Sequence, residues 1–112
     1  TSEAKIQSNI KFSKIIEGTF PMGSMTGAPK IKSMNIIDEY ESVKRGLYSG
    51  SVGYIKPNKD FDFNVIIRSI IYDRSLKEIN VSVGSAITFK SDPESEYDEC
   101  LIKAEPMIRS LK

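Results

Sequence analysis

The sequence contains no histidine, which excludes catalysis by Ser-His or Cys-His pairs within these 112 residues. A zinc site with histidine ligands is excluded for the same reason. The single cysteine, Cys100, cannot form an internal disulfide, and this favours a reduced protein in the cytoplasm. Cys100 lies beside Leu101, and we expect it to be a small buried apolar residue rather than a nucleophile.

Positive and negative charges are nearly balanced, since the sequence has 16 Lys and Arg and 15 Asp and Glu, for a net charge of +1. We therefore expect neither nucleic acid nor an anionic membrane as a partner. The longest apolar runs are too short to span a bilayer, and the N-terminus does not resemble a signal peptide. The chain starts at Thr1 without a methionine, which we interpret as a sign that it was cut from something longer; the alternative is a processed or re-cloned N-terminus.

The first third of the chain is expected to be helical with one loop. Apolar spacing predicts a helix over residues 9–17, with Ser8 or Asn9 as its N-cap. Residues 20–30 contain two glycines and two prolines, and we expect a shaped loop without a regular element there. Pro29 suits the first turn of the helix that follows.

The middle of the chain has the alternation of a sheet. Strands are predicted over residues 50–56, 61–72 and 78–84, and the short connections favour antiparallel neighbours. With helices on either side in sequence, the predicted fold class is α+β, a small antiparallel sheet with packed helices.

The last segment is predicted to be a helix. Ser91 and Glu94 have the spacing of a capping box, and Pro93 fits the first turn. Pro106 removes a helical hydrogen bond and is expected to kink or end the helix near Glu105. An apolar stripe is formed by Tyr97, Leu101, Ala104, Ile108 and Leu111.

Glu96, Glu99 and Lys103 fall within a sector of roughly 60° on this helix. Two carboxylates on one face suit a hard cation such as Mg²⁺, which takes few protein ligands. A lysine one turn further on could meet a substrate carboxylate. The alternative from spacing alone is a solvated helical face with a Glu-to-Lys ion pair.

Arg68 interrupts an otherwise apolar predicted strand. Its planar guanidinium suits recognition of a carboxylate, and the alternative is a solvent-facing position on an edge strand. Ser24 lies in the Gly-rich loop, which could present backbone N–H groups to an anion but does not have P-loop spacing. Tyr48 is placed at the entry to a strand, where core packing is the alternative role.

Together, these stretches resemble the chorismate-binding enzyme family. FPMGSMTGAPK at residues 20–30 resembles the family's FPGGSxTGAPK signature, and GSVGYI at 50–55 resembles its GxxGY strand. NVIIRSI at 64–70 is similar to the N-x-x-I-R-T/S-I strand, and SDPESEYDECLIK at 91–103 to SDPxxEYxExxxK. The four motifs occur in the family's order and cover nearly the whole chain from about residue 10.

The resemblance implies a fold, a cofactor and site residues. Residues 1–112 would be the C-terminal part of a large α/β catalytic domain that uses chorismate or isochorismate with Mg²⁺. Glu96 and Glu99 match the metal-site glutamates, and the substrate-binding positions of the family correspond to Ser24, Tyr48, Arg68, Gly84 and Lys103. The sequence departs from the family's G-x-G at Ala86, where a second glycine is usual.

The same resemblance implies an amination. The Ser and Thr of the signature loop are closer to those of the aminodeoxychorismate synthases, which convert chorismate to 4-amino-4-deoxychorismate on the route to para-aminobenzoate and folate. The alternatives are the anthranilate synthases or a non-catalytic module that binds chorismate or docks on a partner. A glutamine amidotransferase subunit or domain would supply ammonia. The upstream half of the family pattern is absent, so the chain alone is expected to be inactive, with no certain catalytic residue of its own.

Overall fold

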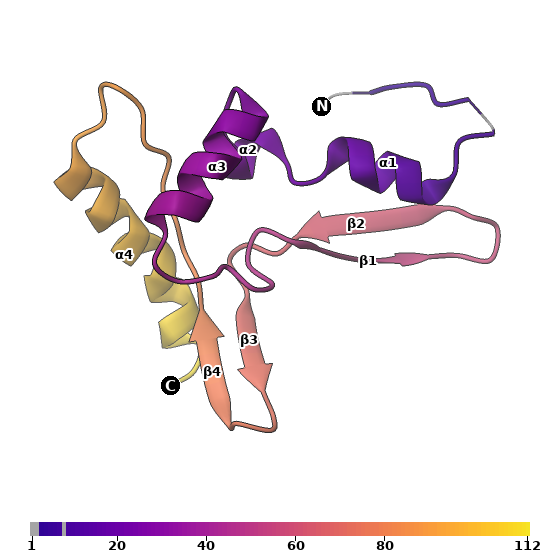
Figure 1. Cartoon of the computed structure of the whole chain (residues 1–112). Helices are drawn as coiled ribbons and strands as arrows, with labels where there is room; N and C mark the ends of the chain where they lie inside the picture. The colour runs from indigo at the N-terminus through magenta and orange to yellow at the C-terminus, as the bar shows by residue number, and fades with distance from the viewer. Residues whose placement is uncertain (1–2, 8) are drawn as a thin grey trace. The chain divides into compact units, whose positions relative to one another are not determined.

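The computed structural model describes residues 3–7 and 9–112, and it contains helices and antiparallel strands, which confirms the α+β prediction (Figure 1). The chain divides into two compact units, Thr1–Lys44 and Arg45–Lys112, which are described separately below.

The described residues of the first unit contain three helices. Helix α1 spans Phe12–Thr19 and begins later than the sequence predicts. Its N-cap is Lys11, whose side chain does not cap the helix, so the predicted cap at Asn9 is wrong. The alternative cap, Ser8, lies outside the described residues.

The loop expected over residues 20–30 contains one helical turn, α2, at Gly23–Thr26. The prediction of no regular element there was therefore wrong. The turn ends at Gly27, which has a φ of 105°. Residues with a Cβ rarely adopt this backbone conformation, whereas glycine adopts it readily. Helix α3 follows at Lys30–Tyr40 and contacts α2. Pro29 is the N-cap of α3 rather than a member of its first turn.

The second unit begins with a β-hairpin. Strand β1 (Ser51–Ile55) pairs with β2 (Phe61–Val65) in antiparallel register, with Gly53 opposite Phe63. The connecting turn is closed by Asn58, whose side-chain oxygen accepts a hydrogen bond of 3.1 Å from the backbone N–H of Asp60.

The predicted strand over residues 61–72 is divided in two, and this corrects the sequence prediction. Strand β2 ends at Val65, and the backbone N–H of Ile67 donates back to the Val65 carbonyl at 3.0 Å, which makes a tight turn. Arg68 then adopts a φ of 49°, a left-handed conformation that cannot continue a strand. Within residues 3–7 and 9–112, the strands therefore form two separate two-stranded sheets instead of one.

The second sheet pairs β3 (Ile70–Asp73) with β4 (Glu78–Val81), again antiparallel. The Asp73 carboxylate accepts hydrogen bonds from the hydroxyl and the backbone N–H of Ser75, at 2.6 and 2.8 Å, and from the Leu76 N–H at 3.1 Å. These bonds, that of the Ser75 hydroxyl first, lower the pKa of Asp73. The carboxylate thereby fixes the turn between the two strands.

Helix α4 spans Pro93–Arg109. Its N-cap is Asp92, which accepts a hydrogen bond of 2.9 Å from the Ser95 N–H, so the capping box predicted from Ser91 is wrong. Pro93 occupies the first turn as predicted. The helix continues through Pro106, because a proline so near the C-terminal end removes one hydrogen bond while the last turn is still closed by Ser110.

The predicted apolar stripe of α4 is largely exposed, since Tyr97 and Leu101 keep 65% and 52% of their surface accessible. The less exposed side of the helix carries Glu96, Cys100, Lys103, Ala104 and Met107. Met107, at 7%, is the one apolar side chain classed as buried among the described residues. This side therefore carries Glu96 and Lys103 of the predicted site, whereas Glu99 is exposed. None of the helices in the described ranges combines the length and apolarity of a membrane span.

Candidate functional site

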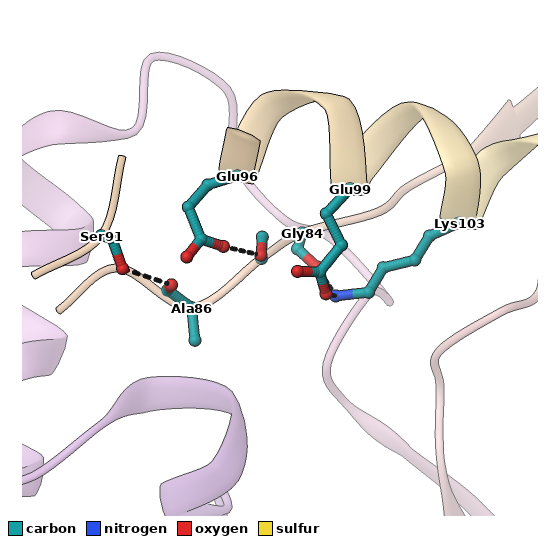
Figure 2. A network of polar contacts seen from close by, with 7 residues as sticks. Gly84, Ala86, Ser91, Glu96, Glu99 and Lys103 are labelled. Atoms are coloured by element: carbon teal, nitrogen blue, oxygen red, sulfur yellow. Dashed lines mark hydrogen bonds and ion pairs between the residues drawn. The ribbon is translucent and has the colours of Figure 1, made fainter. Parts of the chain in front are cut away.

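Helix α4 presents Glu96, Glu99 and Lys103 toward the segment that follows β4, as Figure 2 shows. The positions are set by the start of the helix, where Asp92 and Pro93 fix the first turn. Glu96 lies in that first turn, where the positive end of the helix dipole favours a negative charge. The helical spacing expected from the sequence is thus confirmed for these three side chains.

Lys103 joins α4 to the following segment. Its Nζ lies 2.5 Å from Oε1 of Glu99 and donates a hydrogen bond of 3.0 Å to the Gly84 carbonyl oxygen (Figure 2). The hydrogen bond from Lys103 is the main cause that lowers the pKa of Glu99, and the same bond is the main cause that raises the pKa of Lys103. Both groups are therefore held in their charged forms, which are the forms that bind a metal ion and a carboxylate.

Ser85 contacts Glu96. Its hydroxyl donates a short hydrogen bond to Oε2 of Glu96. The sequence analysis did not single out Ser85. Its position between Gly84 and Ala86, within the segment that resembles the family's G-x-G, is the feature of the sequence that could have indicated it.

Gly84 also approaches Tyr48, which lies ahead of β1. A Cβ built on Gly84 would lie 2.9 Å from the Tyr48 hydroxyl oxygen, closer than side-chain atoms normally approach. The charge of Tyr48 is among the smaller causes that raise the pKa of Lys103. The guanidinium of Arg45 lies 6.0 Å from the centre of the Tyr48 ring. Tyr48, Gly84 and Lys103 are therefore neighbours.

Ala86 fits its position without strain, because its φ lies outside the left-handed region. Its carbonyl oxygen accepts a hydrogen bond of 3.5 Å from the Ser91 hydroxyl (Figure 2). The same hydroxyl accepts a hydrogen bond of 3.0 Å from the Thr88 N–H. Ser91 thus holds the loop that leads into α4 rather than capping the helix. The departure from the family's second glycine leaves the backbone conformation of this loop accessible to alanine.

Two predicted site residues stand apart from these contacts. Arg68 lies in the exposed bend between β2 and β3, and the described residues give it no hydrogen bond or ion pair. It therefore needs no partner of the kind expected for a charge within an apolar strand. Ser24 is exposed on α2 and belongs to the unit Thr1–Lys44.

Two carboxylates are what α4 can offer a metal ion. Within residues 3–7 and 9–112, no cluster of three or more His, Cys, Asp or Glu side chains is placed to hold one. Glu96 and Glu99 fit a cation such as Mg²⁺ as part of a ligand set, because Mg²⁺ commonly takes one or two carboxylates and completes its shell with water and substrate oxygens. Cys100 is a free thiol and only half-buried.

Comparison with known proteins agrees with this arrangement of motifs. A sequence model of the chorismate binding enzyme family matches residues 1–109. The chain belongs to this family.

Several relatives carry the name aminodeoxychorismate synthase. The chloroplastic protein of Oryza sativa subsp. japonica, named "Probable aminodeoxychorismate synthase", is 49% identical over 89 residues, which are 80% of this chain and 10% of that protein. Aminodeoxychorismate synthase component 1 of Bacillus subtilis is 37% identical over 98% of this chain and 23% of its own length. Anthranilate synthase component 1 of Acinetobacter calcoaceticus is 36% identical over 98% of this chain and 22% of its own. The chain thus spans at most about a quarter of each of these three relatives.

Proposed function

We propose that this chain supplies metal-binding and substrate-binding groups to an aminodeoxychorismate synthase, which replaces the 4-hydroxyl of chorismate by an amino group. Chorismate and ammonia would give 4-amino-4-deoxychorismate and water. The observation that carries the proposal is that Lys103, Tyr48 and Glu96 all meet the short segment Gly84–Ser85, while Lys103 also pairs with Glu99. These are positions of the family's motifs in a chain that the family model covers over residues 1–109.

Glu96 and Glu99 would hold Mg²⁺, and their charges and shared helical face support this role. The chemistry supplied by the bound ion would be that of a Lewis acid at the ring carboxylate of chorismate. Lys103 would pair with a substrate carboxylate. Its ion pair with Glu99 is partly exposed, so the ammonium group can exchange partners when an anion arrives.

Tyr48, Arg68 and the backbone N–H of Gly84 would bind the pyruvyl carboxylate. Arg68 is exposed and without an ion-pair partner in the described part of the chain, which leaves its guanidinium available to a ligand. Ser24 would contribute a hydroxyl from α2. A glutamine amidotransferase subunit or domain would supply the ammonia, and the cytoplasm is the expected location on the strength of the single free cysteine.

A second candidate is anthranilate synthesis, which the relative from Acinetobacter calcoaceticus favours at 36% identity. Anthranilate formation removes the enolpyruvyl side chain as pyruvate, whereas 4-amino-4-deoxychorismate keeps it. The intact protein should be incubated with chorismate, ammonia and Mg²⁺, and the products separated by chromatography while pyruvate is measured in parallel. We expect 4-amino-4-deoxychorismate without stoichiometric pyruvate. Anthranilate with an equivalent of pyruvate would contradict the proposal.

The 112 residues alone should give no product in this assay, because they correspond to 10–23% of the three relatives described above. A site that depends on further groups cannot be preorganised by one part of it. Turnover by the 112-residue chain would show that it carries a complete active site, and would overturn the assignment of Glu96, Glu99 and Lys103 as one portion of a larger site.

A further inference from the structure

Ser85 connects two parts of the second unit that are separate in sequence. Its hydroxyl donates to Glu96 Oε2, although Glu96 belongs to α4 and Ser85 follows β4. Beside it, Lys103 donates to the Gly84 carbonyl oxygen at 3.0 Å (Figure 2). Residues 84–85 are therefore tied to α4 through two of its side chains, Glu96 and Lys103.

A hydroxyl at this point restricts the Glu96 side chain in a specific way. A glutamate side chain has three rotatable bonds, and ordering it costs entropy each time a cation must be bound. A hydrogen bond to one carboxylate oxygen holds the group in place and leaves its other lone pairs for a metal. Ser85 has a single hydroxyl proton, and in this structure it donates that proton to Glu96.

We propose that Ser85 is a positioning residue that orients Glu96 for a divalent cation. The inference rests on the proposed metal-binding role of Glu96 and Glu99. Ser85 is not a ligand of the cation in this proposal, and it acts through the Glu96 carboxylate alone. Loss of an outer hydrogen bond of this kind typically costs about 10- to 100-fold in metal affinity.

The test is direct binding of Mn²⁺, as a spectroscopic substitute for Mg²⁺, to the intact protein without substrate. Free Mn²⁺ is measured by its electron paramagnetic resonance signal during titration. Ser85→Ala should raise the dissociation constant about 10-fold or more, and Ser85→Thr, which keeps the hydroxyl, should stay within about threefold of the unmodified protein. Ser82→Ala is the matched control, because the described contacts do not link Ser82 to either glutamate.

Two further variants separate the outcomes. Glu96→Gln and Glu99→Gln should each weaken Mn²⁺ binding more than Ser85→Ala does, because each removes a charged ligand. If these two variants weaken binding and Ser85→Ala does not, the positioning role is wrong and the metal site stands. If neither glutamate variant weakens binding, the proposed metal site itself is wrong.

Ser85→Thr also separates positioning from folding. Thermal unfolding of each variant shows whether the substitution disturbs the fold. A Ser85→Ala protein that unfolds at the normal temperature yet binds Mn²⁺ weakly, with recovery in Ser85→Thr, supports the inference. Equal weakening in Ser85→Ala and Ser85→Thr, at unchanged unfolding temperature, would show that the hydroxyl is not what matters and would overturn it.

Discussion

The two motif glycines, Gly53 and Gly84, should respond to the same substitution in different ways. Neither has a φ in the left-handed region, so the space around a new Cβ decides the outcome. At Gly53 the Cβ would lie 2.1 Å from the carbonyl oxygen of Asp62 and 2.8 Å from the Cα of Phe63. These are backbone atoms of the paired strand β2, and the two strands must separate to admit a methyl group.

At Gly84 the obstructing atom is the Tyr48 hydroxyl oxygen, 2.9 Å away, at the end of a side chain that can rotate. Gly53→Ala should therefore destabilise the β1–β2 hairpin by about 1–3 kcal/mol, as overpacking usually does. Gly84→Ala should cost less than about 1 kcal/mol in stability but displace Tyr48. Losing one hydrogen bond to a substrate carboxylate is worth about 1.5–3 kcal/mol, or roughly 10- to 150-fold in chorismate affinity.

Hydrogen exchange measured by mass spectrometry on the intact protein follows the hairpin directly. Amides of residues 51–65 should exchange about 5- to 150-fold faster in Gly53→Ala and at a nearly normal rate in Gly84→Ala. Calorimetric titration with chorismate should show the affinity loss in Gly84→Ala. Normal exchange of residues 51–65 in Gly53→Ala, or unchanged chorismate affinity in Gly84→Ala, would refute the reasoning from these contacts.

Two further substitutions test the packing of α4 and the turn between β3 and β4. Met107→Ala removes the side chain with 7% exposure and should lower the free energy of unfolding of α4 by about 2–3 kcal/mol. Ile102→Ala is the control, because this side chain is 67% exposed and its loss should cost less than about 1 kcal/mol. Hydrogen exchange of residues 93–109 measures both effects. Because the pKa of Asp73 is lowered in the folded protein, its stabilising effect is complete above the ordinary Asp pKa and is lost as the pH falls through the folded value. Asp73→Asn should remove that pH dependence, which is checked by acid unfolding of both proteins; an unchanged acid profile would contradict the role of this carboxylate.

Local sequence rules predicted the parts of the site that lie on one element. The positions of Glu96, Glu99 and Lys103 on α4 follow from 3.6 residues per turn, and the structure confirms their common face. The start of α4 was less predictable because Ser91 and Asp92 are both good caps. The choice depends on the loop, where the Ser91 hydroxyl is already bonded to Thr88 and Ala86.

The contacts between elements could not be read from spacing. Nothing in the alternation of residues 78–84 indicates that Gly84 meets Tyr48, because the two are 36 positions apart and their approach depends on the path of the chain between them. The apolar run at 61–72 similarly indicates one long strand. The division of this run into two strands depends on the left-handed backbone conformation of Arg68, which the pattern of apolar residues does not predict.

The left-handed conformation of Arg68 links this error to the proposed function. A non-glycine residue with φ of 49° carries a conformational cost of about 1–2 kcal/mol that glycine would avoid. Glycine would relieve the backbone at this bend, but it would also remove the guanidinium that we propose for the pyruvyl carboxylate. The same bend ends β2 and exposes the Arg68 side chain, whereas a continuous strand would have kept this charge within a ladder. The left-handed backbone at Arg68 therefore supports a functional role for its side chain, because strained conformations of this kind cluster at ligand-binding sites.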